Sequence, residues 1–246
     1  MSVSNEELND LKASCPTYYI AGADNDVRRM MGVYGFRRVD KVKDADIVVF
    51  TGGSDINPYL YGQRRHPTTG VNMLRDLADI NVLKQTARYT QGLVGICRGG
   101  QLLNCLVGNG SMWQNVNHHA IEGTHDAVDR DGVVHKVNSY HHQMMIPGSE
   151  AQVLLKASVS TLREGPENIR MVKDIARVAD PDWDDPEVLY YPDTSTLCFQ
   201  PHPEERKAVS TRDLFFRYLE EYMLSTKMSA HLAEFRTKFA LRQANN

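Results

Sequence analysis

Short apolar runs alternate along the chain with amphipathic stretches, and this alternation indicates a sheet covered by helices. The first four runs of strand length are Tyr18–Ala21, Phe36–Val39, Ala45–Phe50 and Leu93–Ile96. The third is nearly all apolar, as expected of a central strand in a parallel sheet that is buried on both faces. Helices are predicted between these runs, from Asp24 or Asn25 to Tyr34 and over Leu74–Tyr89. The order predicts an α/β fold with a mostly parallel central sheet.

The stretch Leu93–Leu103, LVGICRGGQLL, contains the first candidate for chemistry. An apolar strand stops at Cys97, and a helical pattern begins immediately after it. Strand, sharp turn and helix form a nucleophile elbow, in which small residues two positions to either side let the helix pack closely. Gly95 and Gly99 occupy those positions. The free N–H groups at the helix start favour the thiolate form of Cys97, although a buried structural cysteine would also fit this stretch alone.

A second motif supplies partners for this thiol. Residues 196–205 read TLCFQPHPEE, a short apolar strand followed by His202, Pro203 and Glu204. In an extended chain, residues two apart point to the same side, so Glu204 can reach the imidazole of His202. A nucleophilic cysteine needs a nearby base, and the base needs a carboxylate that orients it. We therefore predict a catalytic triad of Cys97, His202 and Glu204, with Glu205 pointing away from it.

These motifs resemble those of the class I glutamine amidotransferases, and most closely the gamma-glutamyl-gamma-aminobutyrate hydrolase (peptidase C26-like) branch. The similarity covers about residues 18 to 224, and Arg98 is typical of the hydrolase branch. Pro201 and Gly100 depart from the family pattern, because an aromatic residue and a larger residue usually stand there. The matching segments are FTGGSDINPYLYG (50–62), the Arg75-Asp76 pair, GICRGGQ (95–101), VNSYHHQ (137–143) and QPHPE (200–204).

The resemblance implies a three-layer, flavodoxin-like α/β fold and a hydrolase that cleaves a gamma-glutamyl amide bond through a glutamyl thioester, without a cofactor. It assigns the oxyanion hole to the backbone N–H groups of Gly53 and Arg98. It assigns the pocket for the glutamyl group to Gln101, Tyr140, His141 and His142.

Two alternatives remain open at this point. The protein could be a glutaminase subunit that supplies ammonia to a separate synthetase, or a catalytically inactive binding protein of the same fold. The intact set of Cys97, His202 and Glu204 argues against the second. Arg98 and the His141-His142 pair follow the hydrolase branch and argue against the first.

Composition and charge exclude several classes of partner. A net charge of −3 and a pI near 6.3 leave no basic footprint, so nucleic acid is not expected. No apolar run approaches membrane-spanning length, and the polar N-terminal stretch is unlike a signal peptide. The few scattered cysteines favour a reducing, cytoplasmic setting without disulfides.

Six histidines lie between His118 and His142, which raises the question of a metal site. Their spacings match no closed-site pattern, and neither a cysteine nor a carboxylate is placed as an obvious partner, so no metal is predicted. A hairpin is predicted here instead, with strands at 125–128 and 133–137 around a turn at 129–132. It delivers residues 138–143 to the site.

The last third of the chain carries fewer signals. Strands are expected at Val153–Leu155 and Val188–Tyr191, and residues 159–186 are expected to form a long, solvated, polar loop containing Asp180, Asp182, Asp184 and Asp185. Thr211–Leu224 is predicted to be the closing helix. We expect one domain over residues 1–246 with a C-terminal helical extension at about 226–246, whose apolar stripe is compatible with a homodimer.

Overall fold

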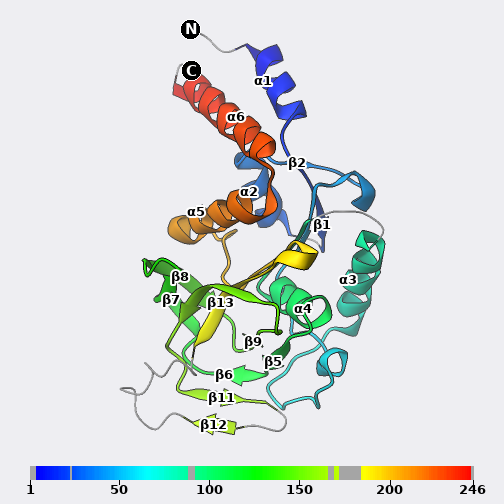
Figure 1. Ribbon diagram of the computed structural model, residues 1–246, viewed down its shortest axis with the longest axis vertical. Coiled ribbons are helices and arrows are strands. Elements are labelled where there is room, and N and C mark those ends of the chain that lie inside the picture. The colour runs from blue at the N-terminus through cyan, green and yellow to red at the C-terminus, as the bar shows by residue number, and fades with distance from the viewer. Residues whose placement is uncertain (1–3, 23, 88–91, 166–168, 172–183, 245–246) are drawn as a thin grey trace.

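A central sheet holds the two chemical motifs on neighbouring parallel strands. The computed structural model describes residues 4–22, 24–87, 92–165, 169–171 and 184–244 (Figure 1). Within them, nine strands form one sheet in the order β2-β1-β3-β4-β14-β13-β10-β7-β8. The first five run parallel to one another: β2 (Arg37–Arg38), β1 (Thr17–Ala21), β3 (Ile47–Phe50), β4 (Gly92–Ile96) and β14 (Thr196–Phe199).

The other four strands extend the sheet with antiparallel pairing. They include the predicted hairpin, which is longer than expected and ends at Tyr140. These strands are β13 (Asp185–Tyr191), β10 (Gln152–Ala157), β7 (Ala120–Asp129) and β8 (Val134–Tyr140). The sheet therefore changes direction beside β14, the strand that leads to His202.

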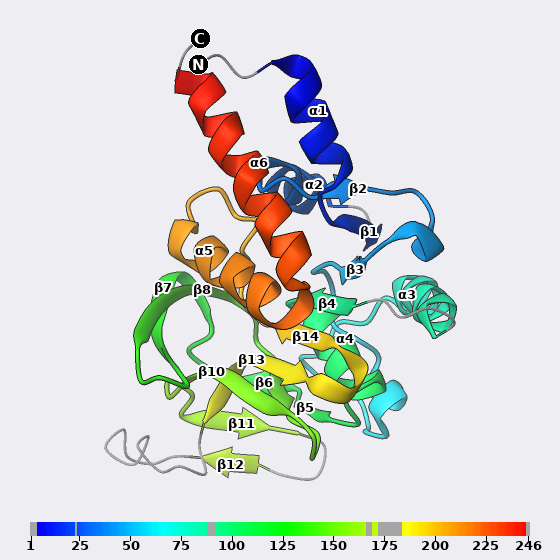
Figure 2. The same ribbon diagram turned by 45° about the horizontal axis from the view of Figure 1, so that its top comes forward.

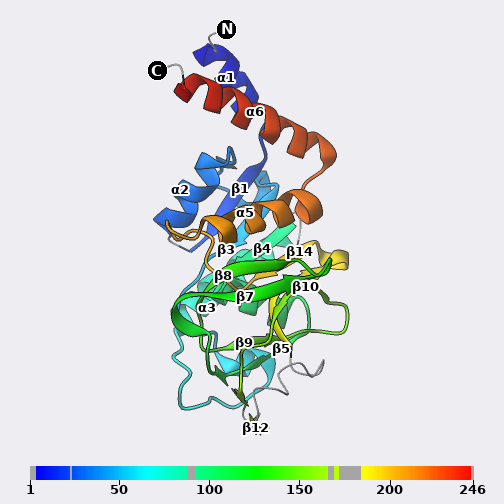
Figure 3. The same ribbon diagram turned by 90° about the vertical axis from the view of Figure 1, so that its left-hand side faces the viewer.

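Helices cover both faces of the sheet, which confirms the α/β architecture. Helices α2 (Asn25–Val33) and α5 (Val209–Tyr218) lie on one face, in front of the strands in Figure 3. Helices α3 (Met73–Thr86) and α4 (Arg98–Leu106) lie on the other (Figure 1). Alternate strand residues face the two cores: Val49 packs in the core of α2 and α5, and Val48 in that of α3 and α4.

The two ends of the chain lie side by side. Helix α1 (Asn5–Ala13) runs next to α6 (Thr226–Ala244), which corresponds to the predicted tail helix (Figures 1 and 2). Leu232 and Phe235 of α6 are buried in the core that also holds α2 and α5, and Lys238 Nζ lies 2.5 Å from Glu7 Oε1. Part of the apolar stripe is thus used inside the chain. No helix among the described residues is long and apolar enough to span a membrane.

The expectation of a solvated loop over residues 159–186 is wrong for its described part. Strands β11 (Leu162–Glu164) and β12 (Ile169–Met171) pair there, and β11 also pairs with β6 (Asn115–Val116). Asp185 begins β13 and is fully buried, and Arg163 Nη2, 2.6 Å away, balances the charge of its carboxylate. Asp184 pairs with Lys156, whereas Asp180 and Asp182 lie outside the described residues. A two-stranded sheet of β5 (Ser111–Trp113) and β9 (Met144–Ile146) completes this region.

Candidate active site

Cys97 stands on the sharp turn between β4 and α4, as the sequence predicts. Its φ of 50° and ψ of −112° are unusual for a residue with a side chain, a strain typical of functional turns. The flanking glycines are required by space. A Cβ at Gly95 would lie 2.3 Å from the backbone of Gly99, and a Cβ at Gly99 would lie 2.1 Å from the carbonyl oxygen of Phe50.

His202 and Glu204 take their predicted places beside this thiol. His202 Nδ1 and Glu204 Oε1 are 2.7 Å apart, with the two side chains 20% and 10% exposed. A Cβ built on Gly52 would lie 3.1 Å from the imidazole and 3.8 Å from Cys97 Cβ, so both side chains lie against this glycine, and the ring interacts with the Cys97 side chain. Burial would lower the pKa of His202, but the sulfur of Cys97 and the carboxylate of Glu204 outweigh it and raise that pKa. These two neighbours favour the imidazolium form of His202.

Two residues that the sequence analysis did not single out hold this pair in place. Asn138 in β8 donates from Nδ2 to the carbonyl of His202 (2.8 Å) and accepts from the N–H of His202 at Oδ1 (2.9 Å). Gln200 donates from Nε2 to Cys97 Sγ at 3.6 Å. The Gln200 amide is in turn bound by Gln101 Nε2 (3.2 Å), so Gln101 acts on the thiol through Gln200.

Arg98 forms a buried ion network with helix α3. Its guanidinium is 1% exposed and pairs with Asp76 (2.5 Å) and with Asp79. Arg75, one turn before Asp79, pairs with the same carboxylate at 3.0 Å and donates to the carbonyls of Thr51 and Gly52 (3.2 and 3.4 Å). The Arg75-Asp76 motif therefore holds two segments in place: Arg75 binds the loop that contains Gly52 and Gly53, and Asp76 binds the residue that follows Cys97. Only the backbone of Arg98 is left for an oxyanion role.

A cavity of about 300 Å³ opens in front of Cys97. It brings together all four residues predicted to contact substrate, Gln101, Tyr140, His141 and His142, and also the proposed oxyanion residue Gly53. The other lining residues are Ser54, Asp55, Thr68, Gly70 and Gln143. Cys97, Gly53 and the four predicted substrate residues thus share one pocket, whereas His202, Glu204 and Arg98 are not part of its lining.

Two carboxylates that the sequence analysis gave no role contact residues of the cavity lining. Asp55 Oδ2 lies 3.1 Å from His142 Nε2, and this contact raises the pKa of His142. Tyr140 donates to Glu205 Oε2 at 2.9 Å, and Asn138 donates to the same oxygen. Glu205 points away from His202, as expected, but it supports the pocket wall.

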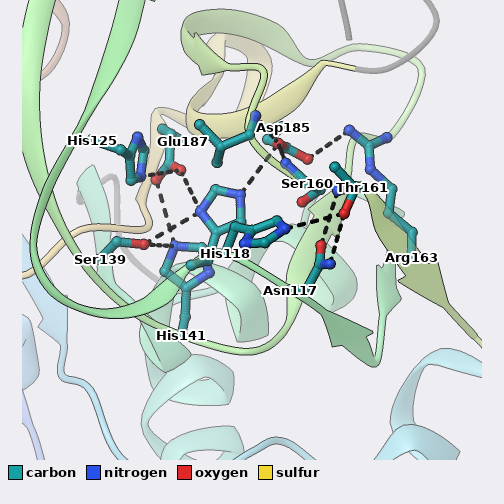
Figure 4. A network of polar contacts seen from close by, with 12 residues as sticks. Asn117, His118, His125, Ser139, His141, Ser160, Thr161, Arg163, Asp185 and Glu187 are labelled. Carbon is teal, nitrogen blue, oxygen red and sulfur yellow. Dashed lines mark hydrogen bonds and ion pairs between the residues drawn. The ribbon is translucent and has the colours of Figure 1, made fainter. Parts of the chain in front are cut away.

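The histidine-rich segment departs from the sequence analysis in one respect. His119, His125 and His141 are buried together around the carboxylate of Glu187 on β13. Figure 4 labels His125, His141 and Glu187 of this group. The expectation that no carboxylate faces these histidines is therefore wrong. The cause is topological, because β13 pairs beside β10 and carries Asp185 and Glu187 back to the hairpin. The other three, His118, His135 and His142, lie outside this group.

The central part of the chain matches proteins of one family. The peptidase C26 family model matches residues 38–161. A putative glutamine amidotransferase-like YvdE homolog of Lactococcus lactis subsp. cremoris is 30% identical over 120 residues, covering 41% of this chain and 63% of that protein. Protein NtpR of Enterococcus hirae is 29% identical over 126 residues, covering 42% and 52%. The chain thus spans less than two thirds of the length of these relatives.

Solved structures share the fold over nearly the whole chain. A putative GMP synthase subunit from Thermoplasma acidophilum superposes with a TM-score of 0.54 at 14% identity, covering 92% of this chain and 98% of that one. A glutamine amidotransferase from Thermotoga maritima gives a TM-score of 0.51 at 11% identity, covering 93% and 95%. With the family match over half of its residues, the chain belongs to the peptidase C26 family of class I glutamine amidotransferase-like proteins.

Proposed function

We propose that this protein is a cysteine hydrolase that cleaves the gamma-glutamyl amide bond of a small gamma-glutamyl compound. The observation that carries the proposal is the triad beside the cavity. Cys97 stands on a glycine-flanked elbow, and His202 meets its sulfur while being held by Glu204 at 2.7 Å.

The first half of the reaction forms a thioester. The thiolate of Cys97 attacks the side-chain carbonyl carbon, and the oxygen becomes an oxyanion that the N–H groups of Gly53 and Arg98 bind. His202, protonated in the resting pair, gives its proton to the departing amine as the C–N bond breaks. Glu204 stabilises the imidazolium until that moment. The glutamyl group stays on sulfur, and the free amine leaves.

Water completes the cycle. Neutral His202 removes a proton from a water molecule, which attacks the thioester carbonyl. The C–S bond breaks, glutamate leaves, and the proton stays on His202, which restores the ion pair. Gln200 Nε2, 3.6 Å from the sulfur, stabilises the thiolate as it reappears. No step needs a cofactor.

The lining of the cavity supports a glutamyl substrate. Its volume lies at the lower end of the range for small-molecule sites, which suits an acyl group of amino-acid size. The free end of a gamma-glutamyl group carries one ammonium and one carboxylate. Asp55 and His142, side by side at the lining, offer one group of each sign. The free thiol that this chemistry needs fits a reducing compartment such as the cytoplasm.

The test is steady-state release of glutamate by the isolated protein from a panel of gamma-glutamyl amines. The alpha-linked isomers of the same compounds and the Cys97→Ala protein serve as controls. We expect turnover of gamma-linked compounds alone and none by the variant.

Turnover of glutamine that remains negligible until a co-purifying protein is added would replace this proposal with an ammonia-supplying subunit. The relatives named as glutamine amidotransferase-like make that the second candidate. Absence of all amidase activity from a folded, free-thiol protein would refute both.

A further inference from the structure

A compact group of ligand atoms lies behind the wall of the catalytic cavity. It joins three segments: His119 and His125 at β7, His141 just after β8, and Glu187 on β13. The side chains of His119 and Glu187 are fully buried, and those of His141 and His125 are 1% and 5% exposed. Figure 4 shows His125, His141 and Glu187 converging on one point. The proposed mechanism uses none of these side chains.

The distances from the Glu187 carboxylate to the three rings are close to those between neighbouring ligands of a tetrahedral metal site. Zinc–nitrogen and zinc–oxygen bonds of about 2.0–2.2 Å place neighbouring ligand atoms about 3.3–3.5 Å apart in a tetrahedron. His119 Nδ1 and His125 Nε2 lie 3.3 and 3.2 Å from Glu187 Oε1, and His141 Nε2 lies 3.7 Å from Oε2. Ligand atoms of His119, His141 and Glu187 all lie within 4.8 Å of one another.

In two of the rings, the contact made by the outer nitrogen decides which nitrogen faces inward with a lone pair. His141 Nδ1 lies 2.8 Å from the carbonyl of Gln143, and His125 Nδ1 lies 3.1 Å from that of Asp126. A carbonyl only accepts, so both Nδ1 atoms carry the hydrogen. His119 Nε2 lies 3.2 Å from Asp185 Oδ2, an ion-pair distance without the geometry of a hydrogen bond. Metal-bound histidines have the arrangement of His125 and His141, with the far nitrogen donating to a carbonyl or carboxylate.

The buried acceptors in this group, the Glu187 oxygens and the inward ring nitrogens, have too few hydrogen-bond donors around them. Among the described residues, neither oxygen of Glu187 has a hydrogen bond of acceptable geometry. The hydroxyl of Ser139 lies 3.3 Å from His119 Nδ1 and 3.2 Å from His141 Nε2, but its single hydrogen can serve only one of them. Unsatisfied buried carboxylates are costly, so another positive group is required here.

Protonating the histidines does not balance both the charge of Glu187 and the lone pairs that face it. One proton on His119 neutralises Glu187 and leaves Ser139 free to donate to His141 Nε2, but the lone pair of His125 Nε2 still faces the same carboxylate. Protonating all three rings places three positive charges against one carboxylate, because Arg163 already balances Asp185 at 2.6 Å. A single divalent cation satisfies three lone pairs and the carboxylate together.

We propose that His119, His141 and Glu187 bind a divalent transition metal, with His125 as the fourth ligand. Three imidazoles and one carboxylate suit Zn²⁺, and a full set of protein ligands makes the site structural. The ion ties β7 and β13 to the segment that follows β8. It thereby fixes His141, His142 and Gln143, which line the catalytic cavity.

The test uses the Cys97→Ala protein, because the catalytic thiol and His202 offer a second place for zinc. The protein is stripped with a chelator and then titrated with Zn²⁺ and with Co²⁺. We expect one equivalent of either metal, visible absorption of four-coordinate Co²⁺ without a thiolate charge-transfer band, and a higher Tm with metal.

Two variants and a matched control locate the ion. Glu187→Gln, nearly identical in shape, should lose the Co²⁺ spectrum, and His125→Gln should weaken binding by about tenfold or more. His118→Gln, the exposed neighbour of His119, should bind as tightly as the parent protein. The Co²⁺ titration of the parent protein decides the question even if a ligand variant does not fold. A parent protein that binds no metal, or a Glu187→Gln protein that binds it unchanged, would overturn the proposal and leave the group held by protons.

Discussion

Replacing Glu204 with glutamine tests the core of the mechanism with almost no change in shape. The carboxylate lies 2.7 Å from His202 Nδ1, and both groups are mostly buried, so solvent screens them little. At an effective dielectric constant of about 20, opposite charges about 4 Å apart attract by about 4 kcal/mol. Glutamine keeps a neutral hydrogen bond, so we expect a loss of about 3–4 kcal/mol. This corresponds to a fall in kcat on the order of 100- to 1,000-fold.

The measurement is a full set of steady-state parameters for a gamma-glutamyl amine, as a function of pH. KM should stay near the wild-type value, since Glu204 does not line the cavity. Removing the carboxylate also removes one cause of the raised pKa of His202. The imidazolium is then lost at lower pH, so the basic limb of the kcat profile should move to lower pH.

Glu205→Gln is the matched control, because the neighbouring carboxylate holds Tyr140 and Asn138 rather than His202. It should raise KM more than it lowers kcat. Equal losses of kcat in the two variants, or a Glu204→Gln protein within about fivefold of wild type, would refute the assigned roles.

Three further outcomes are expected. Asn138→Ala removes the partner of the His202 backbone N–H and the shorter of two hydrogen bonds to its carbonyl, at a cost of about 1–3 kcal/mol, so kcat should fall about tenfold and Asn138→Asp should not restore it. Gly99→Ala drives a methyl group into the Phe50 carbonyl and should lower the free energy of unfolding by about 1–3 kcal/mol, measured by denaturant titration; an unchanged midpoint would contradict the close packing at the elbow. Iodoacetamide followed by mass spectrometry should label Cys97 first and at a rate that falls when substrate is present, because burial raises the pKa of the remaining thiols, Cys15, Cys105 and Cys198; equal labelling would remove Cys97 from its role.

Local spacing was sufficient to predict the elbow and the partners of its thiol. Gly95, Cys97 and Gly99 lie within five positions, and His202 and Glu204 are two apart, so their geometry follows from the strand and the turn. Gln200 could have been found in the same way, because it stands two residues before His202 on the same side of the chain. The sequence gives no sign of its contact with Cys97, because a glutamine just after a strand carries no signal by itself.

Contacts that depend on strand order could not be predicted. Asn138 reaches His202 across 64 positions, and only the pairing of β8 at the sheet edge brings it there. Glu187 meets three histidines because β13 lies between β14 and β10. In the sequence it follows Pro186 at the end of an acidic run, which is typical of a solvated loop. The error over residues 159–186 has the same origin.

The ion network beneath the elbow has a consequence for how this family can be mutated. Helix α3 holds both halves of the proposed oxyanion site, since Arg75 binds the carbonyls before Gly53 while Asp76 and Asp79 bind Arg98. Substitutions of these residues on α3 should therefore abolish activity even though none of them contacts the substrate. Their carboxylates act only by positioning the backbone of the proposed oxyanion site. Relatives should keep Arg75, Asp76, Asp79 and Arg98 together or replace all four, because any one of them alone would be a charged group without its counterpart.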